Sequence, residues 1–164
     1  MSDSDYPTDP KIDALVARFP RLFKGQPPRV WSDLPPGWTE LADRLFVDLD
    51  AMLDNDAAMR FKIIQIKEKF ASLRVYWQLG KEQTLVMDLH GPGSVQRIDT
   101  VPAKPTVFFD QLKARVQQAV AEAATTCQRC GNGSASTNAS GWIVTLCESC
   151  RGKSDAQPDA QVAP

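Results

Sequence analysis

Four cysteines, the only ones in the chain, constrain its fold more than any other feature of the sequence. They form two Cys-x-x-Cys pairs, in which Cys127 is paired with Cys130 and Cys147 with Cys150. Each pair places two thiols on one side of a tight turn, and two such turns joined by a short hairpin can surround one tetrahedral ion. The spacing therefore predicts a zinc ribbon over residues 127–150, with one structural Zn²⁺ bound by all four thiolates.

Two other interpretations of the cysteines are a redox dithiol pair and a pair of structural disulfides. A redox site usually has a single Cys-x-x-Cys in a thioredoxin-like context, so two copies at metal-binding spacing favour zinc. Four sulfur ligands leave no open position for water, and the metal is expected to hold structure rather than to catalyse a reaction. Residues 131–138 are expected to form a loop, and Gly141–Leu146 a short strand that leads to Cys147.

Composition places the chain among ordinary soluble proteins. Its 164 residues are 43% hydrophobic and 24% charged, with a net charge of −1. The acidic N-terminus lacks the apolar segment of a signal peptide, and no apolar run reaches the roughly 18 residues that a membrane-spanning helix needs. Thiols that are kept for a metal indicate a reducing compartment. We therefore expect a cytoplasmic protein with no membrane partner.

Helical spacing of apolar residues predicts helices in both halves of the chain. The first is a short helix from Asp9-Pro10 to Pro20, followed by an extended, proline-rich segment over 21–36 in which Trp31 packs on the core. A second helix opens at Gly37-Trp38 and places Asp43, Asp48 and Asp50 away from its apolar stripe, on an acidic outer face. A third helix is expected over 106–125, covering the sheet and running directly into Cys127.

Alternation of apolar and polar residues predicts strands in the middle third. Ile64 and Ile66 alternate with polar neighbours, a second run follows over 73–79, and a third over 85–89, so these segments are expected to form a three-stranded antiparallel meander. Residues 95–100 are expected to add a further short strand. The polar face of this sheet carries Arg74 and Tyr76, which gives a basic surface next to the acidic helical half.

The predicted fold class is α+β, with a small antiparallel sheet of about three to four strands packed with about three helices, plus a C-terminal zinc ribbon. The domain organisation follows from the composition of the segments. Residues 1–8 are expected to be a disordered N-terminus, 9–126 the α+β domain, 127–150 the zinc ribbon and 151–164 a disordered tail.

Two strings of residues carry a resemblance to a known group. They are the segment from Gln65 to Tyr76, QIKEKFASLRVY, and the ribbon pattern C-x-x-C-G…G-W…T-L-C-x-x-C that begins at Cys127. The chain resembles a group of uncharacterised bacterial and prophage-associated proteins, which share a K-E-K-F-G-x-L-R-x-Y segment, a C-terminal ribbon and an early Gly-Trp pair. Gly37-Trp38 is the matching pair here, whereas Ala71 departs from the usual glycine. The resemblance implies a role connected with mobile elements, such as a toxin-neutralising immunity protein or a phage-derived modulator of a host protein.

The sequence does not offer the residues of a catalytic site. The chain has one histidine, no cysteine outside the metal pattern and no glycine-rich phosphate loop, so we expect neither an enzyme nor a small-molecule substrate. Docking to a partner protein is the preferred function, through the acidic face of Asp43, Asp48 and Asp50 or through the ribbon tip that contains Trp142. The alternative is nucleic-acid binding, in which Arg129 at the knuckle and the sheet face of Arg74 and Tyr76 would contact the ligand.

Overall fold

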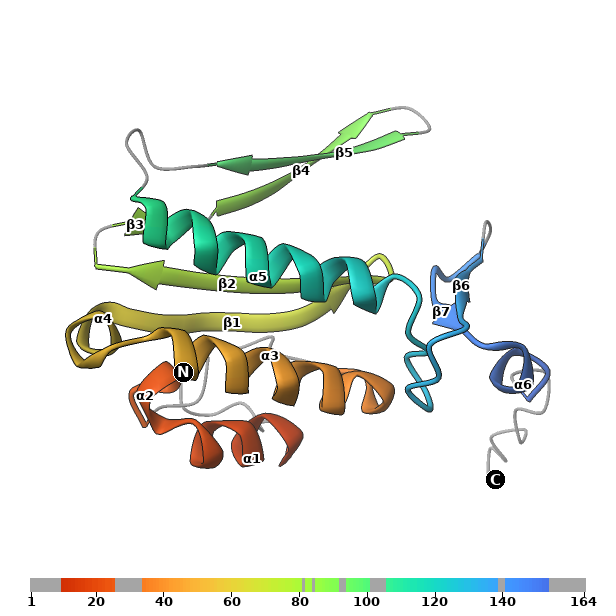
Figure 1. The fold of residues 1–164 in the computed structure, drawn as a ribbon. Helices are drawn as coiled ribbons and strands as arrows, with labels where there is room; N and C mark the ends of the chain where they lie inside the picture. The colour runs from red at the N-terminus through yellow and green to blue at the C-terminus, as the bar shows by residue number, and fades with distance from the viewer. Residues whose placement is uncertain are drawn as a thin grey trace, which may run out of the picture.

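The computed structural model describes residues 10–25, 34–80, 82–83, 85–91, 94–100, 106–138 and 141–153. It is an α+β fold, as predicted (Figure 1). Its helices are α1 (Pro10–Arg18), α2 (Pro20–Phe23), the 3₁₀ turn η1 (Pro36–Trp38), α3 (Thr39–Met52), α4 (Asn55–Arg60), α5 (Val107–Ala123) and α6 (Glu148–Arg151). Its strands are β1 (Phe61–Lys69), β2 (Ser72–Leu79), β3 (Glu82–Gln83), β4 (Leu85–Gly91), β5 (Ser94–Thr100), β6 (Ser136–Thr137) and β7 (Thr145–Leu146).

The described strands form three antiparallel sheets. The main sheet has the order β1-β2-β3, while β4 pairs with β5 and β6 with β7. The prediction of a meander is therefore wrong in its third strand, because the run over 85–89 lies in β4 and pairs with β5 instead of β2. The two-residue strand β3 takes the place next to β2. The predicted strand over 95–100 is confirmed as β5.

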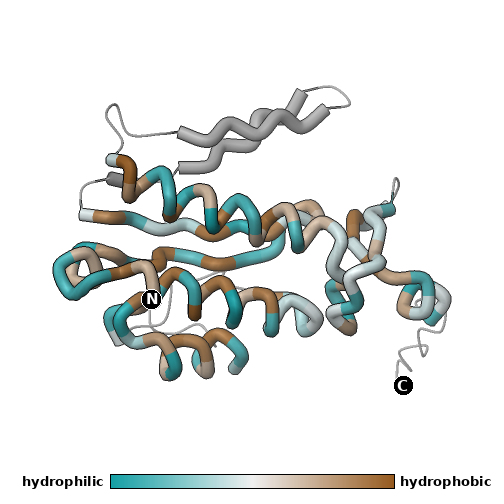
Figure 2. The backbone as a smooth tube through the Cα atoms, viewed as in Figure 1, coloured by the Kyte–Doolittle hydropathy of each residue, from teal (hydrophilic) through white to brown (hydrophobic). Residues whose placement is uncertain are grey.

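Helices cover the apolar face of the main sheet and enclose one core. Helix α5 packs on β2, α2 packs on β1, and α3 lies between α5 and the two N-terminal helices (Figure 1). The ring of Trp77 on β2 lies 4.7 Å from the ring of Phe109 on α5 and 5.7 Å from that of Phe61 on β1. Hydrophobic residues recur along α3, α5 and the two long strands (Figure 2), as the predicted periodicity requires.

The apolar alternation of β1 is broken by a β-bulge. The register with β2 shifts between Ile63 and Gln65, so Ile64 lies in the irregular position. Ile63 and Ile66 are fully buried, whereas Ile64 is only partly covered. The expectation that Ile64 and Ile66 share one face is therefore wrong, because the extra residue changes the face on which the following side chains lie.

A two-residue turn joins β1 to β2, where a longer connection over 67–71 was expected. Phe70 and Ala71 both have positive φ angles, 53° and 56°, which is the backbone of the tight turns that match the twist of a hairpin. The backbone N–H of Ala71 donates to Oε1 of Glu68 at 2.6 Å, which adds a local hydrogen bond to the turn. The left-handed conformation is thus kept even though alanine occupies the position where glycine is usual.

Several short elements and boundaries differ from the expectations. Helix α2 lies at the start of the segment expected to be extended. Helix α4 has Asp54 as its N-cap residue, and the Asp54 side chain accepts from the N–H of Ala57. Arg151 belongs to α6 instead of a disordered tail. Gly152 is the C-cap residue of α6. The predictions for residues 1–8, Trp31 and residues 154–164 of the tail lie outside the described residues.

Candidate metal centre

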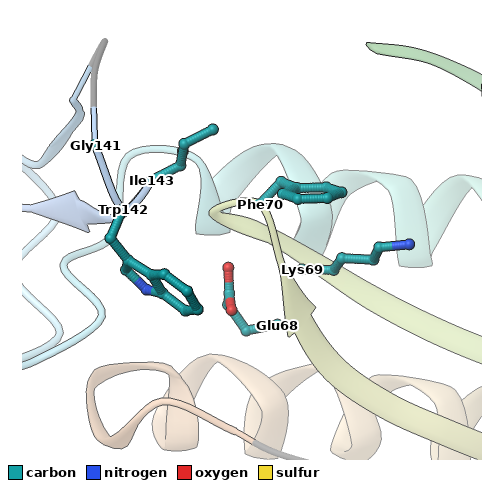
Figure 3. A pocket seen from close by; sticks show the side chains of 6 residues that line it. All are labelled: Glu68, Lys69, Phe70, Gly141, Trp142 and Ile143. Carbon is teal, nitrogen blue, oxygen red and sulfur yellow. The ribbon is translucent and has the colours of Figure 1, made fainter. Parts of the chain in front are cut away.

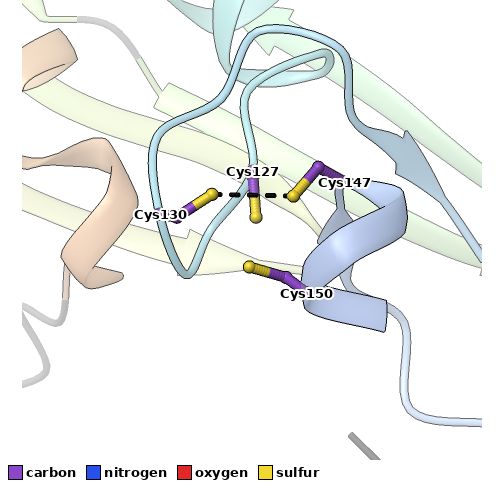
Figure 4. A group of neighbouring side chains, drawn as sticks. All are labelled: Cys127, Cys130, Cys147 and Cys150. Atoms are coloured by element: carbon purple, nitrogen blue, oxygen red, sulfur yellow. Dashed lines mark hydrogen bonds between the residues drawn. The ribbon is translucent and has the colours of Figure 1, made fainter. Parts of the chain in front are cut away.

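The four cysteine side chains converge on one point at the end of the molecule beyond α5 (Figure 4). All four are free thiols, and their sulfur atoms lie within 4.8 Å of one another. The sulfur atoms of Cys130 and Cys147 are 3.6 Å apart. Cys127, Cys147 and Cys150 are buried, and Cys130 is exposed. The predicted ligands are therefore brought together in a group that could hold a metal ion.

Backbone hydrogen bonds shape the first cysteine knuckle. The N–H of Gly131 donates to the carbonyl of Cys127 at 2.9 Å, and the N–H of Cys127 donates to the carbonyl of Asn132 at 2.8 Å. Gly131 has a φ angle of +79°, which favours glycine and reverses the chain directly after the second thiol. The N–H of Gln128 donates to the carbonyl of Thr145, so the knuckle is also bound to β7.

The second knuckle is the start of a short helix. Cys147 is the N-cap residue of α6, and its carbonyl accepts from the N–H groups of Cys150 and Arg151 at 3.1 and 2.9 Å. The predicted strand over 141–146 is reduced to the two residues of β7, which pair with β6 inside the segment expected to be a loop. The guanidinium of Arg151 donates to the carbonyls of Ser136 and Leu146, which holds α6 against this small hairpin.

The thiols differ in their acidity. Hydrogen bonds from the Ser149 hydroxyl and the Cys150 backbone lower the pKa of Cys147 to about 6. The side chain of Cys130, together with burial, raises the pKa of Cys150 to about 12. Burial alone would raise the pKa of Cys127, but the backbone N–H groups around it outweigh burial and lower it. The site thus combines a readily ionised thiol with one that keeps its proton at neutral pH.

The Gly37-Trp38 pair of η1 joins the first cysteine knuckle to the body of the protein. The N–H of Gly37 donates to the carbonyl of Gln128 at 2.8 Å. The indole N–H of buried Trp38 donates to the carbonyl of Thr126 at 2.9 Å. A Cβ atom built on Gly37 would lie 2.0 Å from the carbonyl oxygen of Cys127, so the two backbones touch. These contacts, together with direct entry from α5, fix the ribbon to the domain.

The acidic face that was predicted to dock a partner is engaged within the molecule. Its three carboxylates each form an ion pair with an arginine on a neighbouring helix: Asp43 with Arg18, Asp48 with Arg115 at 2.7 Å, and Asp50 with Arg21 at 3.5 Å. These pairs tie α3 to α1, α2 and α5. The face therefore presents much less uncompensated negative charge than the sequence suggests.

The basic residues proposed to contact a partner are not gathered into one surface. Arg74 is only 4% exposed, so the expectation that it lies on an exposed face is wrong. Tyr76 is half-buried, and the ammonium of Lys67 lies over its ring at 5.4 Å. Arg129 donates to the carbonyl of Cys150 at 3.1 Å and so supports the ribbon.

Trp142, by contrast, lines an open apolar cleft between the ribbon and the β1–β2 hairpin (Figure 3). The cleft has a volume of about 350 Å³ and is lined by Glu68, Lys69, Phe70, Gly141, Trp142 and Ile143. Trp142 is 84% exposed, Phe70 46% and Ile143 40%. The sequence identified Trp142 through the ribbon tip, but nothing in it indicated that Phe70 would lie nearby.

Comparison with known proteins returned no match among family models, curated proteins or solved structures. In the described part of the chain, no helix has both the length and the apolar character needed to cross a membrane.

Proposed function

We propose that this protein is a non-enzymatic binding module whose ribbon is held by one structural Zn²⁺. Tetrahedral zinc with Zn–S bonds of about 2.3 Å places its sulfur ligands about 3.8 Å apart. The 3.6 Å separation of the Cys130 and Cys147 sulfur atoms agrees with this spacing. Four thiolates are also the donor set that selects zinc in structural sites, and they leave no position for a reacting water. Free thiols at this site fit a reducing compartment such as the cytoplasm.

The ribbon and the β1–β2 hairpin together dock a partner protein. The observation that carries this proposal is the exposure of Trp142, Phe70 and Ile143 around one cleft. Exposed aromatic residues that surround a concave surface are typical of binding energy hot spots. The metal matters to docking because it holds the ribbon wall of the cleft in place. If the resemblance to prophage-associated proteins extends to function, this partner is a toxin or a host protein.

Affinity purification from the native host tests docking, with Trp142→Ala compared with Met59→Ala. Met59 is the matched control, because its apolar side chain is 73% exposed on α4 and does not line the cleft. We expect one stoichiometric protein that survives nuclease treatment, is retained by the Met59 variant and is lost from the Trp142 variant. A partner that both variants retain would refute docking at this cleft. Recovery of nucleic acid alone, lost only in the Trp142 variant, would support the alternative of nucleic-acid binding.

A further inference from the structure

The cleft contains a carboxylate as well as apolar side chains. Glu68 lies at the end of β1, and its carboxylate projects into the space between Trp142 and Phe70 (Figure 3). Its Oε1 atom accepts from the N–H of Ala71 at 2.6 Å, which fixes the direction of the side chain. The cleft is thus a small open space lined by aromatic side chains, with a carboxylate projecting into it.

The opposite wall of the cleft is also held in position. The side chain of Asn138 donates to the carbonyl of Trp142 at 2.8 Å and accepts from the N–H of Val144 at 2.7 Å. Gly141 has a φ angle of +75°, so the chain reverses directly before the tryptophan. The backbone that carries the indole is therefore anchored, although the indole itself is open to solvent.

We infer that this cleft binds an arginine side chain of the partner, with the guanidinium stacked on Trp142 and paired with Glu68. This inference rests on the proposed docking function and specifies its chemistry. Tryptophan is the best aromatic partner for a cation, and arginine combines a planar face for stacking with N–H groups for a carboxylate. A partly enclosed carboxylate beside two aromatic rings is complementary to a cation and unfavourable for an anion.

Lys69 limits how strongly a cation can bind at the hairpin side of the cleft. Its ammonium lies 5.3 Å from the centre of the Phe70 ring. The same positive charge repels an incoming guanidinium at the hairpin side of the cleft. An arginine is therefore directed towards the indole of Trp142, and removal of the Lys69 charge should tighten its binding.

The test is an NMR titration of the zinc-loaded full chain with the capped peptide Ac-Gly-Arg-Gly-NH₂. The peptide with citrulline in place of arginine is the matched control, because citrulline has the same shape without the charge. The indole N–H signal of Trp142 is the readout, and the Trp142→Phe variant assigns it among the four tryptophans. We expect a saturable shift with arginine and binding at least about tenfold weaker with citrulline.

Two substitutions separate charge from shape. Glu68→Gln keeps an oxygen that can accept from the N–H of Ala71, so it should fold normally and weaken arginine binding by about tenfold. Lys69→Gln should strengthen arginine binding, because it removes a positive charge that repels the guanidinium. Equal binding of arginine and citrulline peptides, an unchanged affinity in Glu68→Gln, or preferred binding of Ac-Gly-Glu-Gly-NH₂ or a short oligonucleotide would each overturn the inference.

The two proposals fail separately. If the arginine peptide binds through Glu68 and no captured protein depends on Trp142, docking of a protein partner is refuted while the arginine site stands. If a protein depends on Trp142 but is retained equally by Glu68→Gln, docking stands and arginine recognition is refuted.

Discussion

Gly37→Ala tests whether the metal-binding knuckle is locked to the body of the protein. The new methyl group would lie 2.0 Å from the carbonyl oxygen of Cys127, 2.6 Å from the nitrogen of Gly131 and 2.9 Å from the carbonyl carbon of Gln128. All three are backbone atoms, so no side-chain rotation can relieve the overlap. The φ angle of Gly37 lies outside the left-handed region, and the effect of the substitution is therefore steric.

The loss of unfolding free energy in Gly37→Ala can be estimated from the contacts that are broken when the knuckle is displaced. Loss of the hydrogen bonds from Gly37 to Gln128 and from Trp38 to Thr126 costs about 1 kcal/mol each. Displacement of closely packed atoms adds about 1–3 kcal/mol. We expect a total of about 3–5 kcal/mol, which lowers the Tm of a domain of this size by about 6–20 °C. Thermal unfolding followed by circular dichroism, with the protein saturated with zinc, measures this change.

Gly133→Ala is the matched control, because it makes the same change inside the ribbon. No atom lies within 4 Å of a Cβ built at Gly133, and its φ angle is also outside the left-handed region. Its Tm should differ from that of the wild type by about 2 °C or less, as expected for an unconstrained surface site. If the two variants have the same Tm, the close contact between the ribbon and η1 does not exist in solution.

The other predictions concern the metal site, the ion pairs and the ribbon loop. Cys147→Ser should abolish stoichiometric zinc in elemental analysis and unfold the ribbon, because metal binding and local folding are one equilibrium; equal zinc content would contradict the assignment. At neutral pH, zinc must displace the proton of Cys150, whose pKa is about 12, so affinity should fall as the pH falls and calorimetry in buffers of different ionisation enthalpy should detect proton release. Asp48→Lys should cost about 0.5–1 kcal/mol in urea unfolding through loss of the ion pair with Arg115, without affecting partner affinity. Asn138→Ala should reduce hydrogen-exchange protection in the ribbon loop by about tenfold while zinc stays bound, since the side-chain hydrogen bonds to Trp142 and Val144 are lost.

The parts of the structure that the sequence predicted are those with strong local signals. Two Cys-x-x-Cys pairs at this spacing are compatible with few local backbone geometries. The four sulfur atoms converge as the spacing predicted. Helix α5 was predicted from its apolar period, and the side chain of Thr106 caps it by accepting from the N–H of Phe109. In both cases, residues close in sequence determine the outcome.

The parts that could not be predicted depend on contacts between distant residues. Nothing in the alternation around Ile64 marks the β-bulge, because the register shift is defined by the pairing with β2. The same holds for β4, whose apolar alternation suits a third meander strand and a separate hairpin equally well. Periodicity identifies a strand, but it does not identify its partner.

The exposure of charged residues around the candidate site could not be predicted either, because it also depends on contacts between distant residues. Asp43, Asp48 and Asp50 look like an exposed acidic surface in the sequence, because their arginine partners lie on other helices. Arg74 follows the polar alternation of β2 and is nevertheless buried. A charge pattern in one element indicates the face on which the residues lie, whereas exposure depends on the elements packed against that face.

The position of the cleft explains why metal binding and recognition are expected to depend on each other. Glu68 and Phe70 belong to a hairpin of the main sheet, whereas Trp142 and Ile143 belong to the ribbon. The two walls are separated by about 70 residues of sequence, and they are held together through the knuckle, η1 and the end of α5. Loss of the metal would remove the constraint on one wall and leave the other intact. Partner affinity should therefore fall on zinc chelation even though no partner atom contacts the metal.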